Sequence, residues 1–136
     1  MVILFGNPSL TQDYVVAAIY SATNNLAIWK ASSGAEKKWI YLDDVGKDLA
    51  VDRHYTDVIE YKGLIYAASA TMGIISIDPF NTAGNNGIVI KEIIRSPFIF
   101  RTPTYLAESS KGNLFIIRRI KELGDYYWHN TLQFEV

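Results

Sequence analysis

The stretch DVIEYKGLIYAAS, residues 57–69, has β-branched and aromatic residues on both sides of Lys62 and Gly63. Gly63 supplies the positive φ angle that a two-residue connection requires, so this stretch predicts a β-hairpin. A matching stretch, TYLAESSKGNLFIIRR at residues 104–119, turns at Gly112, 49 positions after Gly63. Repeats of about 40–50 residues with four strands each are typical of β-propeller blades. The repeat therefore predicts an all-β fold.

Strand patterns continue along the whole chain and predict a single domain, residues 1–136, that is a partial β-propeller. It would hold about two and a half four-stranded antiparallel blades: blade one at 1–42, blade two at 56–95 and an incomplete blade three at 104–136. A propeller closes into a ring of about four to eight blades. We therefore expect a piece of a longer propeller; a truncated gene product, or a subunit that completes a ring by association, are the alternatives.

Composition argues against several classes of protein. A hydrophobic fraction of 49% and a charged fraction of 20% are ordinary for a globular domain. The net charge of −1 gives no overall attraction for nucleic acid or an anionic membrane. There is no cysteine, so disulfides and thiol chemistry are excluded. Since no leader peptide or membrane segment is recognisable either, we expect an intracellular chain, cytoplasmic or nuclear.

Residues that could carry catalysis or bind a metal do not form a recognisable motif. His54 and His129, the two histidines, are far apart and fall in predicted loops. An acidic stretch at 43–52 lacks the ligand spacing of a calcium loop, and no Gly-x-Ser-x-Gly marks a nucleophile. We therefore expect no catalytic residue, no metal and no cofactor.

A basic and aromatic cluster raises the question of nucleic acid. Arg118, Arg119 and Lys121 precede the aromatic run at 126–128. Basic residues beside aromatic rings can bind single strands by stacking. Three positive charges on an acidic chain are weak support, and Arg118 and Arg119 lie on a predicted strand. We expect no nucleic-acid partner.

The connections that leave one face of the predicted propeller suggest a protein interface. These are 43–55, 70–72, 95–103 and 121–129, and they are rich in Arg and aromatic side chains, which dominate interface hot spots. An alternative is that the aromatic residues of 95–103 only fill space between blades. The candidate partner-binding residues are Arg53, His54, Phe100, Arg101, Tyr127 and Trp128.

Several blocks together resemble the carboxy-terminal propeller domain of plant F-box proteins of the KIB type, a domain of unknown function. The first are YVVAAIY (14–20), LAIW (26–29), WIYL (39–42) and DVIEYKGLIYA (57–67). The later ones are YLAESS (105–110), LFIIRR (114–119) and TLQFEV (131–136). The likeness extends over nearly the whole chain.

The resemblance implies a non-enzymatic module that binds a protein target. In that family an F-box docks onto the Skp1-type adaptor of a ubiquitin ligase, and the propeller is thought to choose the target. Residues 1–136 hold no F-box and no later blades, so the adaptor is an expected partner only if the full-length protein carries an F-box elsewhere. The family offers no catalytic residues to carry over.

Two other hypotheses remain. The chain could belong to a propeller-type enzyme or carbohydrate-binding domain, in which Asp57, Glu60 and Glu108 on the innermost strands would be the ionisable groups of the central channel. Metal-dependent activity that is lost in Asp57→Asn would favour it. A degenerate fragment without independent function is the third hypothesis.

Overall fold

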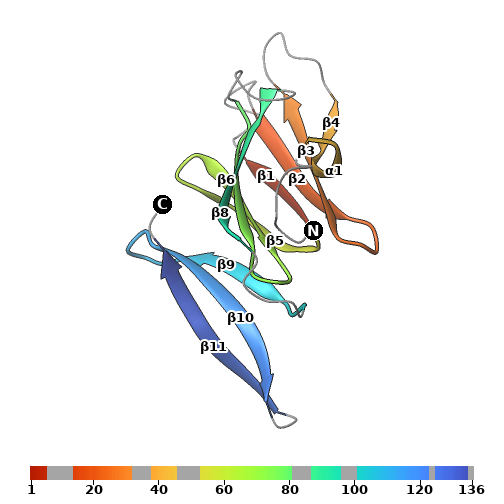
Figure 1. Ribbon diagram of the computed structural model, residues 1–136. Coiled ribbons are helices and arrows are strands. Elements are labelled where there is room, and N and C mark those ends of the chain that lie inside the picture. The colour runs from red at the N-terminus through yellow and green to blue at the C-terminus, as the bar shows by residue number, and fades with distance from the viewer. Residues whose placement is uncertain are drawn as a thin grey trace.

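The computed structural model describes residues 1–5, 14–31, 38–45, 53–80, 87–95, 101–122 and 125–134. These residues form three antiparallel sheets, and within each sheet every strand pairs with the next one along the chain (Figure 1). The first sheet contains β1 (Val2–Phe5), β2 (Tyr14–Tyr20), β3 (Asn25–Ala31) and β4 (Trp39–Tyr41). The second contains β5 (Tyr55–Tyr61), β6 (Leu64–Ser69), β7 (Ile74–Asp78) and β8 (Val89–Ile94).

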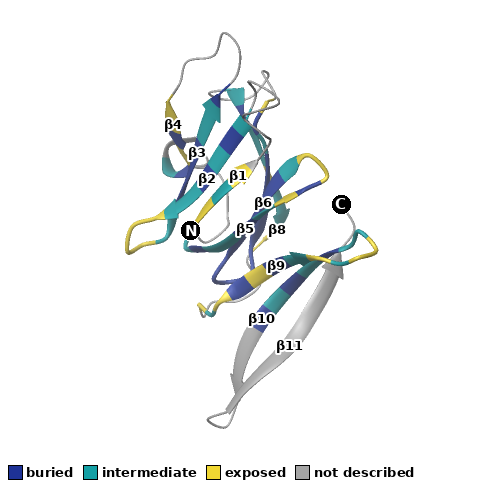
Figure 2. Ribbon diagram, turned by 180° about the vertical axis from the view of Figure 1, so that it is seen from behind, coloured by how far each residue is buried: buried dark blue, intermediate teal, exposed yellow. Residues whose placement is uncertain are grey.

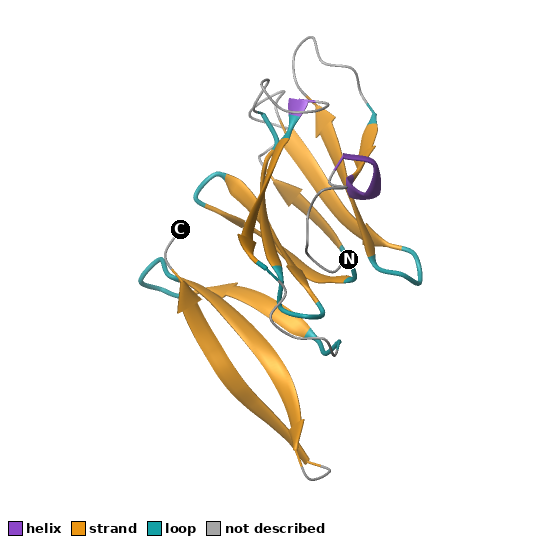
Figure 3. Cartoon of the chain, viewed as in Figure 1, coloured by secondary structure: helices purple, strands orange, loops and turns teal. Residues whose placement is uncertain are grey.

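The third sheet contains β9 (Thr104–Glu108), β10 (Leu114–Glu122) and β11 (Asp125–Phe134). The sheets of four, four and three strands are the blades expected from the sequence, so the prediction of an all-β partial propeller is confirmed. A single turn of helix, α1 (Leu42–Val45), follows β4 and was not predicted (Figure 3). In the described part of the chain, no helix has the length and apolar character needed to cross a membrane.

The prediction of a loop at 121–129 was wrong. β10 continues to Glu122, β11 begins at Asp125, and the two strands stay paired through this region. Tyr127, Trp128 and His129 therefore lie on β11, opposite Ile120, Arg119 and Arg118. Aromatic residues have high β-propensity, and pairing with a neighbouring strand outweighed the turn signals that suggested a loop.

The second sheet is buried on both faces, because it lies between the other two (Figure 2). One core cluster joins Leu26 and Ile28 of the first sheet to Ile75 and Ile77 of the second. A second cluster joins Ile74 of the second sheet to residues of the third. Alternate residues of β7 thus face opposite clusters, which explains why this strand is an almost continuous apolar run.

The outer face of the first sheet, turned away from the second, is also apolar. The ring pairs Tyr20–Tyr41 and Trp29–Trp39 pack there with centroids 5.8 Å apart in each pair. Trp39 and Tyr41 are exposed, as are the β1 residues of the same face. The first sheet therefore carries apolar side chains on both faces, like the central sheet.

The hairpin turns have the backbone geometry expected from their glycines. Lys62 and Gly63 both have positive φ angles, 49° and 80°, which is the pattern of a type I′ turn. Gly112 has a φ of 80°, and its amide donates to the Ser109 carbonyl at 2.9 Å. The expectation that Gly63 adopts a positive φ is confirmed.

We expect Gly112→Ala to lower the free energy of unfolding by about 1–2 kcal/mol, because an L side chain is strained at positive φ. A Cβ at this position would meet no atom within 4 Å, so the cost is that of the backbone alone. Urea unfolding would show a lower midpoint with an unchanged m-value. Ser110→Ala, at an exposed position of the same turn, is the control; an equal loss there would contradict the explanation.

Candidate functional site

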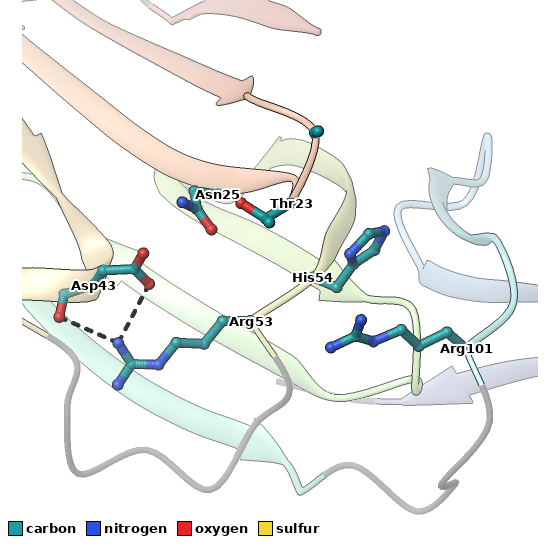
Figure 4. Close-up of a pocket in the computed structure, with 7 residues that line it drawn as sticks. Thr23, Asn25, Asp43, Arg53, His54 and Arg101 are labelled. Atoms are coloured by element: carbon teal, nitrogen blue, oxygen red, sulfur yellow. Dashed lines mark hydrogen bonds and ion pairs between the residues drawn. The ribbon is translucent and has the colours of Figure 1, made fainter.

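An open pocket of about 450 Å³ lies where the turn between β2 and β3 meets the segments that enter β5 and β9 (Figure 4). Seven of the described residues line it, and six of these have polar or charged side chains. The lining residues are Ala22, Thr23, Asn25, Asp43, Arg53, His54 and Arg101. They come from the turn between β2 and β3, the start of β3, α1 and the segments before β5 and β9, so the pocket depends on the packing of the three sheets.

Backbone hydrogen bonds hold the segments around the pocket in place. The Tyr55 amide, next to His54, donates to the Asn24 carbonyl at 3.0 Å. The Ala70 amide donates to the His54 carbonyl at 2.8 Å, and the Thr102 amide donates to the Ala70 carbonyl at 2.9 Å. Since these bonds run from the first sheet's turn to the segment before β9, the pocket walls have fixed relative positions.

Within the pocket, Arg53 is directed toward Asp43. Its Nη1 donates to the Asp43 backbone carbonyl at 3.2 Å and lies 3.4 Å from Oδ1 of the same residue. Both side chains are partly exposed, so the ion pair contributes at most about 1 kcal/mol to stability. Its main consequence is positional, because it ties α1 to the segment that enters β5.

Of the candidate partner-binding residues, Arg53, His54 and Arg101 line this one pocket. Phe100 lies outside the described residues. Tyr127 and Trp128 are on β11, where only the backbone is described. A role of these residues in binding stays a prediction.

Sequence reasoning missed Thr23 and Asn25, and it placed Asp43 on the binding face, in the connection 43–55, without naming it as a candidate residue. The turn at 21–24 connects the second and third strands of its blade, as 70–72 does in the next blade. Connections between the second and third strands leave each blade on the same face, so the segment 21–24 belonged with 70–72 in the prediction, from which it was omitted. Within the turn at 21–24, the Thr23 hydroxyl lies 2.9 Å from the Ser21 hydroxyl.

The innermost strands β5 and β9 are joined by two side chains, a contact that we call the inner seam. Thr56 donates its hydroxyl proton to the Thr104 carbonyl at 2.6 Å and accepts from the Thr104 amide at 3.2 Å. Asp57 accepts from the Val58 amide through Oδ1 at 2.9 Å and from the Leu106 amide through Oδ2 at 2.8 Å. A β-bulge at Thr56 turns these neighbouring side chains toward β9.

Burial raises the pKa of Asp57, while the hydrogen bonds from Leu106 and Val58 act in the opposite direction. Both carboxylate oxygens are occupied by backbone amides, so this group holds two blades together. Glu60 and Glu108, the other carboxylates considered for a central channel, are exposed. Among the described residues, no group of three His, Cys, Asp or Glu side chains is placed to hold a metal ion.

Arg118, on β10 of the third sheet, is a buried residue. It is 5% exposed, and its Nε donates to the Thr102 hydroxyl. Burial lowers its pKa. Its guanidinium is therefore not presented to solvent, where a nucleic-acid phosphate would have to meet it.

Comparison with known proteins identifies the family. A family model described as the KIB1-4 beta-propeller matches residues 1–136. The chain belongs to this family. Searches of curated proteins and of solved structures found no match. The family is a β-propeller domain of unknown function and not a known enzyme family, and its architecture suggests a protein-interaction module.

Proposed function

We propose that the chain is the target-binding propeller of an F-box-type ubiquitin ligase receptor, and that it binds a protein through the face that carries the pocket. The observation that supports this most is the convergence of Arg53, His54 and Arg101. These residues come from segments before two different blades and line one open pocket. Arginine is over-represented among the side chains that dominate protein interfaces.

The inner strands support binding rather than catalysis. A propeller enzyme would use ionisable side chains at the central channel, and Asp57 is the half-buried carboxylate on these strands. Its two oxygens are already engaged by backbone amides of β5 and β9. A carboxylate whose two oxygens both accept hydrogen bonds from backbone amides is poorly placed to act as a base or metal ligand.

The proposal has a second part, that the full-length protein belongs to a ubiquitin ligase. It rests on the likeness to F-box proteins of the KIB type, in which an F-box contacts the Skp1-type adaptor. The proposal therefore concerns target choice by this propeller, with adaptor binding assigned to an F-box elsewhere in the full-length protein.

Affinity purification with the tagged chain from a plant cell extract tests the binding face. We expect the wild type to capture a partner protein. The double variant His54→Ala/Arg101→Ala should capture at least about tenfold less of that partner, as for interface hot spots. Lys111→Ala, an exposed cation in the turn between β9 and β10, is the charge-matched control and should leave capture unchanged.

Circular dichroism must show that all three proteins are equally folded. If every captured protein binds the double variant as well as the wild type, the proposed face is wrong. If Lys111→Ala loses the same partner, the interaction reflects general charge and the proposal also falls.

A further inference from the structure

We propose that two copies of residues 1–136 associate head to tail, so that the outer face of the first sheet of one copy packs on the third sheet of the other. The side of the third sheet that takes part is turned away from the second sheet, and we call it the far face. It carries Ala107, Phe115 and Ile117. This inference goes beyond the proposed function and does not depend on it, since it concerns the faces of the sheets and not the pocket.

The 49-residue repeat shows that the same kind of contact occurs twice along the chain. Ile65 and Ala67 of β6 belong to the cluster that joins the second sheet to the first. Their counterparts 49 positions later, Leu114 and Ile116 of β10, belong to the cluster that joins the third sheet to the second. Each sheet therefore turns the same face to the sheet that precedes it.

The far face of the third sheet corresponds to a face that is buried in the second sheet. Tyr66 and Ala68 occupy the alternate positions of β6, are almost completely buried, and belong to the cluster that packs on the third sheet. Their counterparts 49 positions later, Phe115 and Ile117, lie on the far face and are only half-buried. The far face thus has apolar residues where the second sheet receives its neighbour, and part of their surface is open.

The outer face of the first sheet corresponds to the face that the second sheet turns to the first. In the second sheet, Ile75 and Ile77 make that face completely buried. In the first sheet, Leu4, Trp39 and Tyr41 remain 53%, 40% and 42% exposed. Among the described residues of this face none is charged. A contiguous exposed apolar face of this kind marks an interaction site.

The two open faces are opposite halves of one type of contact, so each fits the other rather than itself. They lie at opposite ends of the described structure, with the second sheet between them (Figure 1). A contact between unlike faces is heterologous, and such contacts close into a ring when the rotation between copies suits it. Three sheets from each of two copies make six, within the range of about four to eight blades in propellers.

The aromatic rings of the outer face suit a second sheet better than a saccharide. The two ring pairs of this face are inclined at 68° and 58°. Rings at these angles do not form the flat platform on which a sugar ring stacks. They leave ridges and hollows between which the side chains of a facing sheet interdigitate, as they do where sheets pack face to face.

Light scattering coupled to gel filtration measures the mass of the chain between about 1 and 100 μM, since association depends on concentration. We expect the wild type to reach twice the mass of one chain. Tyr41→Glu on the outer face and Phe115→Glu on the far face each place a charge in the contact, so each should stay monomeric. Phe80→Glu makes the same change at an exposed aromatic residue in the turn after β7, and this matched control should pair as the wild type does.

Mixing the two variants tests the head-to-tail arrangement itself. Tyr41→Glu keeps an intact far face and Phe115→Glu keeps an intact outer face, so the mixture can form one native contact. We expect a mixed pair in the mixture, although neither variant pairs alone. Circular dichroism must show that each variant is folded, and Ile117→Ser, a milder change on the same face, replaces Phe115→Glu if that variant is not.

A wild type that is still monomeric at about 100 μM would overturn the inference. Pairing that survives Tyr41→Glu would also overturn it. If Phe115→Glu pairs alone and mixing restores nothing, two outer faces pack together and the head-to-tail arrangement is wrong. Target capture through the pocket is measured separately, so failure of this inference leaves the proposed function unaffected.

Discussion

Replacing Ile75 with alanine is expected to lower the free energy of unfolding by about 2–5 kcal/mol. Ile75 lies on β7, is completely buried, and belongs to the cluster that packs the first sheet against the second. Its removal leaves a cavity lined by residues of both sheets, which rigid neighbouring strands cannot close. Because small domains are stable by only about 5–15 kcal/mol, this is one of the largest effects a single substitution here can have.

Chemical unfolding monitored by tryptophan fluorescence measures the decrease in the free energy of unfolding, and Phe80→Ala serves as control. Phe80 is 47% exposed in the turn after β7, so its truncation should change stability by no more than about 0.5 kcal/mol. Hydrogen exchange should show that Ile75→Ala weakens protection in the first and second sheets. A loss below about 0.5 kcal/mol for Ile75→Ala would contradict the packing of these two sheets.

Asp57→Asn is the second substitution with a large expected effect. It should lower the free energy of unfolding by about 1–3 kcal/mol at neutral pH, because it breaks the inner seam. The carboxylate offers two acceptor oxygens to two amides, those of Val58 and Leu106. An asparagine offers one acceptor and one NH₂ group, so one of the two amides would face a donor. Glu60→Gln, an exposed carboxyl on the same strand, is the matched control and should cost little.

The pH dependence of this loss has a definite sign. Since burial raises the pKa of Asp57, the folded chain binds this proton more tightly than the unfolded chain does. The contribution of this group to stability is therefore fully present below the unfolded pKa, about 3.9, and decreases as the pH rises through the higher folded pKa. Asparagine does not titrate, so the stability difference between wild type and Asp57→Asn should widen from neutral pH to about pH 3.

Unfolding curves at several pH values for the wild type, Asp57→Asn and Glu60→Gln check this direction. A difference that narrows on acidification would show that the hydrogen bonds from Val58 and Leu106 outweigh burial. The role of Asp57 in the inner seam would be wrong if Asp57→Asn were as stable as Glu60→Gln at every pH.

The strands were largely predictable because their signals are local. The hairpin at 57–69 was recognised from a glycine at a two-residue turn, and the structure has β5 and β6 at 55–61 and 64–69. The error at 121–129 was also local. In that segment the turn residues favour a loop, whereas the aromatic run favours a strand. Pairing with β10 stabilises the strand, and the sequence of the segment alone does not show that pairing.

The candidate site was only partly predictable. The connection rule for propeller blades placed Arg53, His54 and Arg101 on one face, and the structure brings them to one pocket. It could not indicate that Arg53 pairs with Asp43, ten positions away, through an unpredicted turn of helix. Side-chain directions in connections depend on the neighbouring segments, which periodicity does not describe.

The amino-acid sequence alone was enough to establish the fold class, the hairpins and the 49-residue repeat. These follow from turn residues and from alternation along the chain, which are short-range properties. Only the tertiary structure showed that Asp57 is bound by the amide of Leu106, one repeat further along the chain. That contact exists because two blades pack side by side, and packing between distant segments sets which polar groups meet and which become buried.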